Sequence, residues 1–357
     1  MNVLWIAAQR EPKIMSCTRT IKTTCAYCGV GCGIEAKVSL DKDSDTRSVI
    51  IQGDRTHPAN FGKLCSKGSS LGETLGLSSR LLAPEMNHQQ VSWDQALGAV
   101  ADGFTKIIAE HGPDSVAFYA SGQLLTEDYY LANKLMKGFI GSANIDTNSR
   151  LCMASAVAGY KRAFGSDTVP NCYEDLERAE LIVLIGSNAA WCHPVTFGRI
   201  RTAKDKNPNL KVVVIDPRRT DSCDIADLHL PLAPGSDVTL FNGLLHYLAD
   251  NQQLDQEYIR AYTEGFSEAL ASAQQDAENL DDVSTRCGLT RDALETFYKL
   301  FSRAAKTVSL YSQGVNQSSS GTDKVNAIIN CHLATGRIGK PGMGPFSITG
   351  QPNAMGG

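Results

Sequence analysis

Four cysteines combine the residue type and the spacing of a metal-cluster site. Cys25, Cys28 and Cys32 fall within eight residues, and Cys65 follows 33 positions after Cys32. Three thiolates on one short loop and a distant fourth can hold the corners of an iron–sulfur cluster. Zinc is the alternative, but zinc sites usually pair two short Cys-x2-Cys hooks, and here the fourth cysteine stands alone. The spacing therefore favours an iron–sulfur cluster and electron transfer.

Cys152 is a separate candidate for metal chemistry. It directly precedes a predicted helix over residues 153–163, and a cysteine near a helix N-terminus tends towards the thiolate form. The alternative is a buried structural cysteine. We adopt that interpretation for most of the other cysteines, at positions 17, 172, 223, 287 and 331.

Two predicted strand ends carry residues suited to a nucleotide. The apolar runs 181–185 and 211–215 predict buried parallel strands joined by a helix. Residues 186–188 (Gly-Ser-Asn) offer N–H donors to a phosphate, and residues 216–218 (Asp-Pro-Arg) offer a carboxylate for ribose or purine and a guanidinium for phosphate. Each segment alone could be an ordinary turn or cap, and no Gly-x-Gly-x-x-Gly fingerprint occurs in this region. Because ligands bind beyond the carboxyl ends of parallel strands, the two together favour a nucleotide site.

Other segments are more ambiguous. Residues 234–237 (Pro-Gly-Ser-Asp) alone would be a turn and a helix cap. The glycine-rich run 335–344 could let the backbone approach a large flat ligand, or could be a flexible linker. Gln351 and Asn353 add side-chain amides suited to a heterocycle.

Composition narrows the class of protein. The chain has 357 residues, 42% hydrophobic and 20% charged, with a net charge of −4 and no long basic run, which argues against nucleic acid as a partner. Eleven cysteines in a chain of this length suit a reducing compartment better than a disulfide framework. No stretch reaches the ~20 apolar residues of a membrane helix, and the six-residue apolar run 3–8 is too short for a signal peptide. We expect a cytoplasmic α/β protein with no membrane partner, and a loose leader over 1–20 in which Met15 could be the natural start.

The pattern along the chain changes near residue 90. Short β-like runs at 34–38 and 49–52 lie in a small segment with little core of its own. Ser92 and Gln95 then form a capping-box signature ahead of an apolar stripe at 93, 97, 100, 104, 107 and 108. Further strands are predicted at 116–120 and 307–311. Further helices are predicted at 127–140, from about 194, and at 236–250, 288–304 and 321–334.

These motifs, in this order, resemble the family of bis-molybdopterin-guanine-dinucleotide oxidoreductases. The resemblance runs from about residue 21 to the end. It rests on the cysteine motif and on segments 65–68 (Cys-Ser-Lys-Gly), 186–188 with His193-Pro194, 216–218, 234–237 and 350–353 (Gly-Gln-Pro-Asn).

The resemblance implies two cofactors, a [4Fe–4S] cluster and a molybdenum bis(molybdopterin guanine dinucleotide). Cys25, Cys28, Cys32 and Cys65 would hold the cluster, Lys67 would conduct electrons to the pterin, and Cys152 would ligate molybdenum. The residues implied in holding one dinucleotide are Gly186, Ser187, Asn188, His193, Asp216, Pro217, Arg218, Asp237, Gly314, Asn316, Gln317, Gly350, Gln351 and Asn353.

The family also implies a fold and a domain order. We expect an α/β chain with a small N-terminal cluster domain at 21–80, followed by domains with mostly parallel sheets. Residues 81–147 would begin a discontinuous α/β domain, 148–350 would form a Rossmann-like domain, and 351–357 would return to the discontinuous one. Members are more than twice as long, so we expect a truncated fold that is inactive alone.

Two positions indicate the substrate. Formate dehydrogenases of the family follow the metal-ligating residue with His and place an Arg before the Gly-Gln pair, whereas this chain has Met153 and Thr349 there. Both differences favour nitrate, and the resemblance places Met153 with Cys152 and Lys67 among the catalytic residues. Segments 149–160 and 314–319 resemble the assimilatory nitrate reductases of bacteria. The implied reaction is two-electron reduction of nitrate to nitrite by oxygen-atom transfer at molybdenum.

Two other functions stay open at this point. One is a formate dehydrogenase or related molybdenum dehydrogenase; the other is an inactive remnant or a cluster-binding electron carrier. The expected partners are nitrate and an electron donor, which could be a flavoprotein NADH reductase subunit, ferredoxin or flavodoxin.

Overall fold

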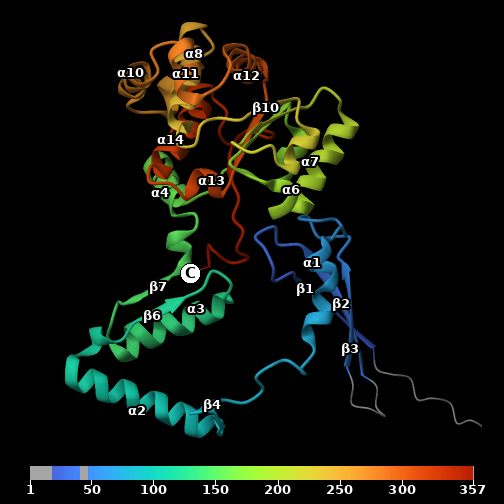
Figure 1. Ribbon diagram of the computed structural model, residues 1–357, viewed down its shortest axis with the longest axis vertical. Coiled ribbons are helices and arrows are strands. Elements are labelled where there is room, and N and C mark those ends of the chain that lie inside the picture. The colour runs from blue at the N-terminus through green and yellow to red at the C-terminus, as the bar shows by residue number, and fades with distance from the viewer. Residues whose placement is uncertain (1–17, 41–46, 357) are drawn as a thin grey trace, which may run out of the picture. The chain divides into compact units, whose positions relative to one another are not determined.

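The computed structural model describes residues 18–40 and 47–356, which divide into two compact units (Figure 1). The first unit comprises Met1–Cys25 with Cys32–Leu82, and the second comprises Ala26–Gly31 with Ala83–Gly357. The predicted start at Met15 and most of the predicted leader lie outside the described residues.

The first unit is a three-stranded antiparallel sheet with short helices. Its strands are β1 (Thr18–Thr24), β2 (Gly33–Leu40) and β3 (Arg47–Gly53), in the order β1-β2-β3, followed by α1 (Ser66–Ser69) and the 3-10 helix η1 (Ser70–Leu75). The leader predicted over 1–20 was wrong at its end, because residues 18–20 pair with β2. The buried apolar side chains among the described residues of this unit are Cys25, Cys32, Ile34 and Ala59, so the small predicted core is confirmed.

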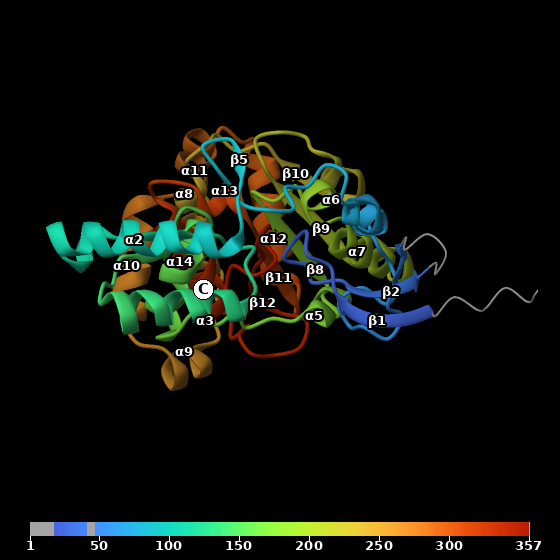
Figure 2. The same cartoon turned by 90° about the horizontal axis from the view of Figure 1, so that it is seen from below.

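A fully parallel sheet forms the centre of the second unit. Its order is β10-β9-β8-β11-β12, with β8 at Leu181–Ile185, β9 at Lys211–Ile215, β10 at Leu228–Leu230, β11 at Thr307–Tyr311 and β12 at Gly344–Ser347. The chain first builds outward from β8 to β10 and then returns to build β11 and β12 on the other side of β8 (Figure 2). The strand order therefore reverses between β8 and β11.

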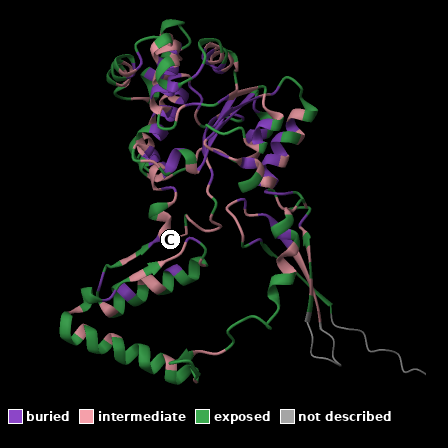
Figure 3. Ribbon diagram, viewed as in Figure 1, coloured by how far each residue is buried: buried purple, intermediate pink, exposed green. Residues whose placement is uncertain are grey.

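Helices cover both faces of this sheet, because the strands bury alternate residues on opposite sides (Figure 3). On one face Ile182, Leu184 and Val212 pack with α5 (Tyr173–Arg178) and α7 (Pro194–Lys206). On the other face Leu181, Val183 and Val213 join a larger core. That core is built from α4 (Ala154–Phe164), α8 (Asp237–Asp250), α10 (Phe266–Asp276), α11 (Leu280–Cys287), α12 (Arg291–Arg303) and α14 (Gly321–Ala334).

The short elements of this unit lie mostly in its loops. They are α6 (Ala189–Cys192), α9 (Gln256–Tyr262), α13 (Gln313–Asn316), and the 3-10 helices η2 (Pro113–Ser115), η4 (Asn148–Leu151) and η5 (Asp221–Ile225). The helix predicted at 288–304 begins at Arg291 instead, because Gly288 takes a left-handed conformation (φ 64°) that ends α11.

Residues 83–147 form the remaining part of the second unit. They comprise β4 (Glu85–Met86), β5 (Gln89–Gln90), α2 (Trp93–His111), β6 (Phe118–Ala120), α3 (Thr126–Asn133), the π-helix η3 (Lys134–Ile140) and β7 (Ile145–Thr147), with β6 and β7 pairing in parallel. The predicted capping box is confirmed, since Ser92 Oγ accepts from the Gln95 amide at 3.2 Å. The single helix predicted over 127–140 changes to π geometry at Lys134.

The apolar stripe of α2 is exposed. Trp93, Leu97 and Val100 are 65%, 59% and 53% exposed, and Figure 3 shows α2 exposed along nearly its whole length. The helix was predicted correctly, but only part of its apolar face is covered among the described residues: Phe104 packs against Phe118, while the positions nearer the start of the helix stay exposed.

The glycine-rich run 335–344 has a structural role in addition to the ligand contact considered for it, which stays a prediction. Arg337 is buried and donates to the carbonyls of Phe301 and Ala304 at 2.9 and 2.6 Å, which caps the end of α12. The same run then leads directly into β12, which pairs with β11. Among the described residues, no helix has the length and apolar character needed to span a membrane.

Candidate functional site

A cavity of about 520 Å³ opens at the carboxyl ends of β8, β9 and β11. Nine of the residues predicted to hold a dinucleotide line it: Gly186, Ser187, Asn188, Asp216, Pro217, Arg218, Asp237, Gly314 and Gln317. The lining also includes Cys192, Ser312, Gln313, Ser318 and Lys324, which the sequence did not single out. The structure therefore brings together segments 186–188, 216–218, 234–237 and 312–318.

Two glycines let the backbones meet where the strand order reverses. Gly186 follows β8 with φ 52°, and its carbonyl accepts from the Gly314 amide at 3.0 Å. A Cβ on Gly186 would lie 2.8 Å from the Gly314 Cα, and one on Gly314 would lie 2.7 Å from the Gly186 Cα. No side chain fits between these two strand ends. The cavity thus has the position at which open parallel sheets bind ligands.

Two polar atoms in the cavity lining lack partners. The Ser187 hydroxyl oxygen and the Gln313 Oε1 are buried and have no hydrogen-bond partner in the part of the chain that the structure describes. An unsatisfied buried polar atom costs about 1–3 kcal/mol. Both atoms therefore fit a polar ligand that completes their hydrogen bonds.

Three charged side chains of the cavity, those of Asp216, Asp237 and Lys324, make polar contacts that hold them in place. Asp216 is buried and accepts from the Arg218 amide at 2.9 Å, so the Asp-Pro-Arg turn is closed by its own first residue. Lys324 Nζ lies 2.7 Å from Asp237 Oδ2, and the two side chains are only 4% and 8% exposed. The carboxylates of Asp216 and Asp237 suit a ligand with hydrogen-bond donors, and the cations Arg218 and Lys324 suit a ligand with negative charge.

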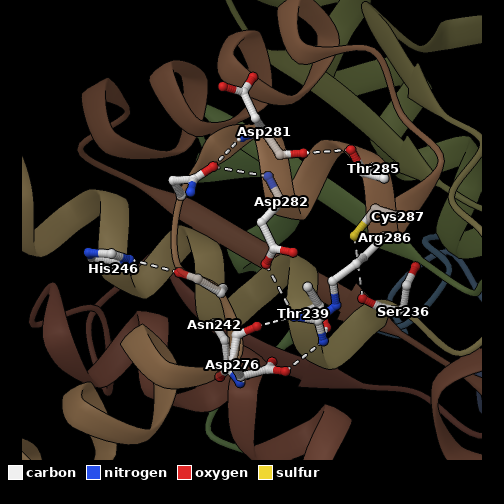
Figure 4. A network of polar contacts seen from close by, with 12 residues as sticks. Ser236, Thr239, Asn242, His246, Asp276, Asp281, Asp282, Thr285, Arg286 and Cys287 are labelled. Carbon is white, nitrogen blue, oxygen red and sulfur yellow. Dashed lines mark hydrogen bonds and ion pairs between the residues drawn. The ribbon is translucent and has the colours of Figure 1, made fainter.

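A polar network that joins α8, α10 and α11 supports the turn that carries Asp237 (Figure 4). The Ala233 amide donates to the Cys287 carbonyl at 2.8 Å, and the Cys287 thiol lies 3.6 Å from the Ser236 carbonyl. Burial raises the pKa of the Cys287 thiol, so it stays protonated and can donate. Arg286 also donates to Thr239 and Asp276, each at 2.7 Å. This turn is therefore anchored at both ends.

Cys152 lies at the end of η4, next to the cavity lining. Gln313 Nε2 donates to its Sγ at 2.9 Å. Met153, which the sequence placed among the catalytic residues, caps the start of α4 with its side chain buried in the core. The thiol and the nucleotide-type cavity are thus connected through one side chain.

The four cysteines of the cluster motif are divided between the two units. In the first unit the Cys25 amide donates to the Cys32 carbonyl at 2.8 Å, Cys65 caps α1, and Lys67 is exposed on α1. Cys28 belongs to segment 26–31 of the second unit. None of these cysteines is in a disulfide.

The segment around Cys28 is anchored within the second unit. The Gly29 amide donates to the Gly350 carbonyl at 3.2 Å, and the Tyr173 hydroxyl to the Val30 carbonyl at 3.1 Å. No three His, Cys, Asp or Glu side chains of the described ranges are placed to hold one metal ion.

Five predicted ligand residues lie outside the cavity lining. His193 is buried, with Nε2 2.7 Å from the Thr349 carbonyl. Asn316 is buried and joins α13 to α4 by accepting from the Ala156 amide at 2.7 Å. The Gly350 carbonyl accepts a hydrogen bond from the Gly29 amide, and the Gln351 side chain donates one to Asn148. Asn353 donates to carbonyls of the segment 122–126. These five residues make contacts within the protein, and their predicted role in holding the dinucleotide stays a prediction.

Lys324 and Gln313 are the functional candidates that the sequence did not reveal. Lys324 lies on α14, 87 positions after Asp237, and Gln313 lies 161 positions after Cys152. Neither has a motif or a local periodicity that marks it. The one available signal for Gln313 was its place two residues after the end of a predicted strand, beside Gly314.

Comparison with known proteins identifies the family. Residues 80–356 match the molybdopterin oxidoreductase family, and residues 18–75 match the molybdopterin oxidoreductase Fe4S4 domain. The chain belongs to the molybdopterin oxidoreductases. It therefore carries a domain for molybdopterin and a domain for a 4Fe–4S cluster. The second match coincides with the unit that holds Cys25, Cys32 and Cys65.

Relatives support this assignment over nearly the whole chain. A nitrate reductase from Klebsiella oxytoca is 57% identical over 94% of this chain, and one from Synechocystis sp. is 45% identical over 97%. The chain spans only 37% and 49% of the length of these two relatives. The acetylene hydratase of Pelobacter acetylenicus has the same fold, with a TM-score of 0.75 at 23% identity over 87% of this chain and 42% of that one.

The residues of this chain fit both cofactor classes. The cavity offers carboxylates, cations and two unsatisfied polar atoms where a parallel sheet binds ligands, which suits the nucleotide arm of a pterin cofactor. Four free cysteines supply sulfur donors, and deprotonated cysteine sulfur is the preferred ligand of iron in clusters. The sulfur of Cys152 beside the cavity is a soft donor of the kind that suits a transition metal.

Proposed function

We propose that this chain is the N-terminal part of an enzyme that reduces nitrate to nitrite. The observation that carries the proposal is that Cys152 is hydrogen-bonded to a side chain of the nucleotide-type cavity. This contact supports a metal ligand beside the binding site for a cofactor arm. The substrate is inferred from Met153 and Thr349, which replace the His and Arg of formate dehydrogenases, and from relatives named nitrate reductase.

The cavity residues have distinct roles in this proposal. The carboxylates of Asp216 and Asp237 can only accept hydrogen bonds, so they suit the N–H groups of guanine and the hydroxyls of ribose. Arg218 and Lys324 supply positive charge for the two phosphates. The Ser187 hydroxyl completes its hydrogen bonding on the same ligand. The cofactor form is accordingly a guanine dinucleotide of molybdopterin.

The remaining residues hold the metals and carry electrons. Cys152 ligates molybdenum, and the four cysteines of the cluster motif hold the iron–sulfur cluster. When bound, molybdenum supplies the two-electron oxygen-atom transfer that converts nitrate to nitrite. Lys67, two residues after Cys65, places a positive charge on the electron route to the pterin. No protein group has to act as a general base.

The biological setting is part of the same proposal. We infer nitrate assimilation in the cytoplasm, from the resemblance of segments 149–160 and 314–319 and from the cysteine content. The electron donor would be a flavoprotein, ferredoxin or flavodoxin. Fractionating cells that produce the enzyme, with periplasmic and cytoplasmic marker proteins as controls, tests the compartment. Recovery with the periplasmic marker would contradict it.

We further infer that residues 81–147 and 351–357 share a domain with additional chain. Asn353 supports this, because its amide donates to the Gly122 carbonyl at 3.0 Å and its side chain to the Leu124 carbonyl at 2.8 Å. The exposed stripe of α2 supports it as well, since an apolar face of this size needs a covering layer. The two nitrate reductases named above are more than twice this length, so they contain additional chain that could supply this layer.

Hydrogen exchange tests this domain assignment. We expect the amides of α2 to exchange much faster in the 357-residue chain than in a longer polypeptide that includes the remaining part of a relative such as the Klebsiella oxytoca enzyme. Exchange of α8, which is already buried, serves as the control and should not change. Equal exchange of α2 in both polypeptides would contradict the assignment.

An assay with reduced viologen tests the function. The longer polypeptide should form nitrite from nitrate, and the 357-residue chain alone should not. Replacing Cys152 by alanine should abolish nitrite formation. Oxidation of formate with an oxidised dye, without reduction of nitrate, would overturn the proposal in favour of a formate dehydrogenase.

A further inference from the structure

Gln313 has two contacts that differ in kind. Its Nε2 donates to Cys152 Sγ at 2.9 Å, and its Oε1 is buried in the cavity lining without a partner among the described residues. With Nε2 donating to the sulfur, Oε1 is the atom of the same amide that is left without a partner. Gln313 thus faces the metal ligand with a donor and the cofactor cavity with an acceptor.

Neighbouring contacts fix the position of this side chain. Gln313 is the first residue of α13, the short helix that follows β11. Asn316 holds α13 against α4 through the Ala156 amide at 2.7 Å, and Gln317 donates to the Leu151 carbonyl at 3.1 Å. The segment on both sides of Cys152 is therefore bonded to α13. Little freedom remains for the distance between Gln313 and the sulfur.

We propose that Gln313 is a positioning residue that holds Cys152 Sγ for the metal and accepts a hydrogen bond from an N–H group of the bound pterin cofactor. This inference rests on the proposed role of Cys152 as the molybdenum ligand. Binding of the cofactor satisfies Oε1, and that second bond keeps Nε2 directed at the sulfur. Hydrogen bonds to a ligating sulfur withdraw electron density from it, so Gln313 also raises the reduction potential of the metal.

The first experiment uses the 357-residue chain without metal. Side-chain amides of 15N-labelled glutamine are observed by NMR, and the Gln313 signal is assigned by its loss in Gln313→Leu. Replacing Cys152 by alanine should move that signal, because the sulfur acceptor is removed. Replacing Cys172, an exposed cysteine outside the cavity lining, should leave it in place. An unmoved Gln313 signal in the Cys152→Ala variant would overturn the proposal.

The second experiment uses the molybdenum-loaded longer enzyme. In an EPR-monitored redox titration, Gln313→Leu and Gln313→Glu should both shift the molybdenum couple to lower potential, because each removes the N–H donor. Gln253→Leu, a surface amide that donates to the Asn251 carbonyl, should not shift it. An unshifted couple in both Gln313 variants would overturn this inference and leave the proposed function intact. No molybdenum signal in the unaltered enzyme would instead contradict the proposed function.

Discussion

The buried ion pair between Lys324 and Asp237 allows a quantitative test of the cavity. Its charged atoms are 2.7 Å apart and its side chains are 4% and 8% exposed. At an effective dielectric constant of about 20, two unit charges at this distance attract by about 6 kcal/mol. Desolvation offsets much of that gain, but removing one partner leaves the other charge buried and unpaired. We therefore expect Lys324→Met and Asp237→Asn each to lower the free energy of unfolding by about 3–5 kcal/mol.

The double variant separates the pair from its two side chains. With both charges gone, Lys324→Met with Asp237→Asn should cost less than the sum of the two single variants by at least about 2 kcal/mol. Urea unfolding of the 357-residue chain gives all four free energies. The matched control is the exposed pair of Arg162 and Asp323 at 2.9 Å, whose side chains are 61% and 64% exposed. Its removal should cost about 1 kcal/mol or less.

Additive losses of unfolding free energy in the single and double variants would contradict a stabilising ion pair. If the double variant costs the sum of the single variants within about 0.5 kcal/mol, the two charges do not stabilise each other. A cost for the buried pair no larger than for the exposed control would lead to the same conclusion.

Three further predictions concern the cavity and the core. Guanosine diphosphate should protect Cys192, which lines the cavity, from alkylation by iodoacetamide, and should leave the equally exposed Cys172 unprotected, as peptide mass spectrometry would show. Gly314→Ala should lower the free energy of urea unfolding by about 1–3 kcal/mol, because the added Cβ would lie 2.7 Å from the Gly186 Cα. Burial, together with the nearby Arg337 guanidinium, lowers the pKa of His332 to about 3. Below about pH 6.5 this histidine therefore binds a proton in the unfolded chain but stays neutral in the folded chain. Stability supplied by neutral His332 is therefore intact above pH 6.5, and about 2 kcal/mol of it should be lost between pH 7 and pH 5, a loss that His332→Gln should not show.

Each of these has a clear opposite outcome. Equal alkylation of Cys192 with and without guanosine diphosphate would show that Cys192 does not lie in the nucleotide site. Gly198→Ala is the control for Gly314, since a Cβ there meets nothing within 4 Å, and an equal cost for both would mean that the close backbone contact is unimportant. Identical pH dependence for the unaltered chain and the His332 variant would show that His332 is not kept neutral by the fold.

The sequence predicted the parallel sheet and the polar turns after its strands because those signals are local. The runs 181–185 and 211–215 are apolar throughout, and polar turn residues follow each of them directly. The capping box at Ser92 is likewise a short-range pattern, and the structure confirms it. Strand β12 was not predicted, because its segment is rich in Gly and Pro and is ordered only by pairing with β11.

Contacts between distant residues limited the rest of the prediction. The pairing of Lys324 with Asp237 and the bond from Gln313 to Cys152 depend on how the chain folds back on the sheet. Periodicity located the helix that begins at Trp93, but it reports which side is apolar and not what covers it. His193 was placed in the site by its motif, and its buried contact with the Thr349 carbonyl could not be read from that motif.

We propose above all that the cavity at the carboxyl ends of β8, β9 and β11 binds a guanine dinucleotide arm. Isothermal titration of the 357-residue chain with guanosine diphosphate and adenosine diphosphate tests it most directly, because the cavity lining belongs entirely to the described part of this chain. We predict one site for guanosine diphosphate and at least about tenfold weaker binding of adenosine diphosphate, where each tenfold corresponds to about 1.4 kcal/mol. The reason is that adenine lacks the N1–H group that donates a hydrogen bond to a carboxylate. No binding of guanosine diphosphate, or equal binding of both nucleotides, would contradict it.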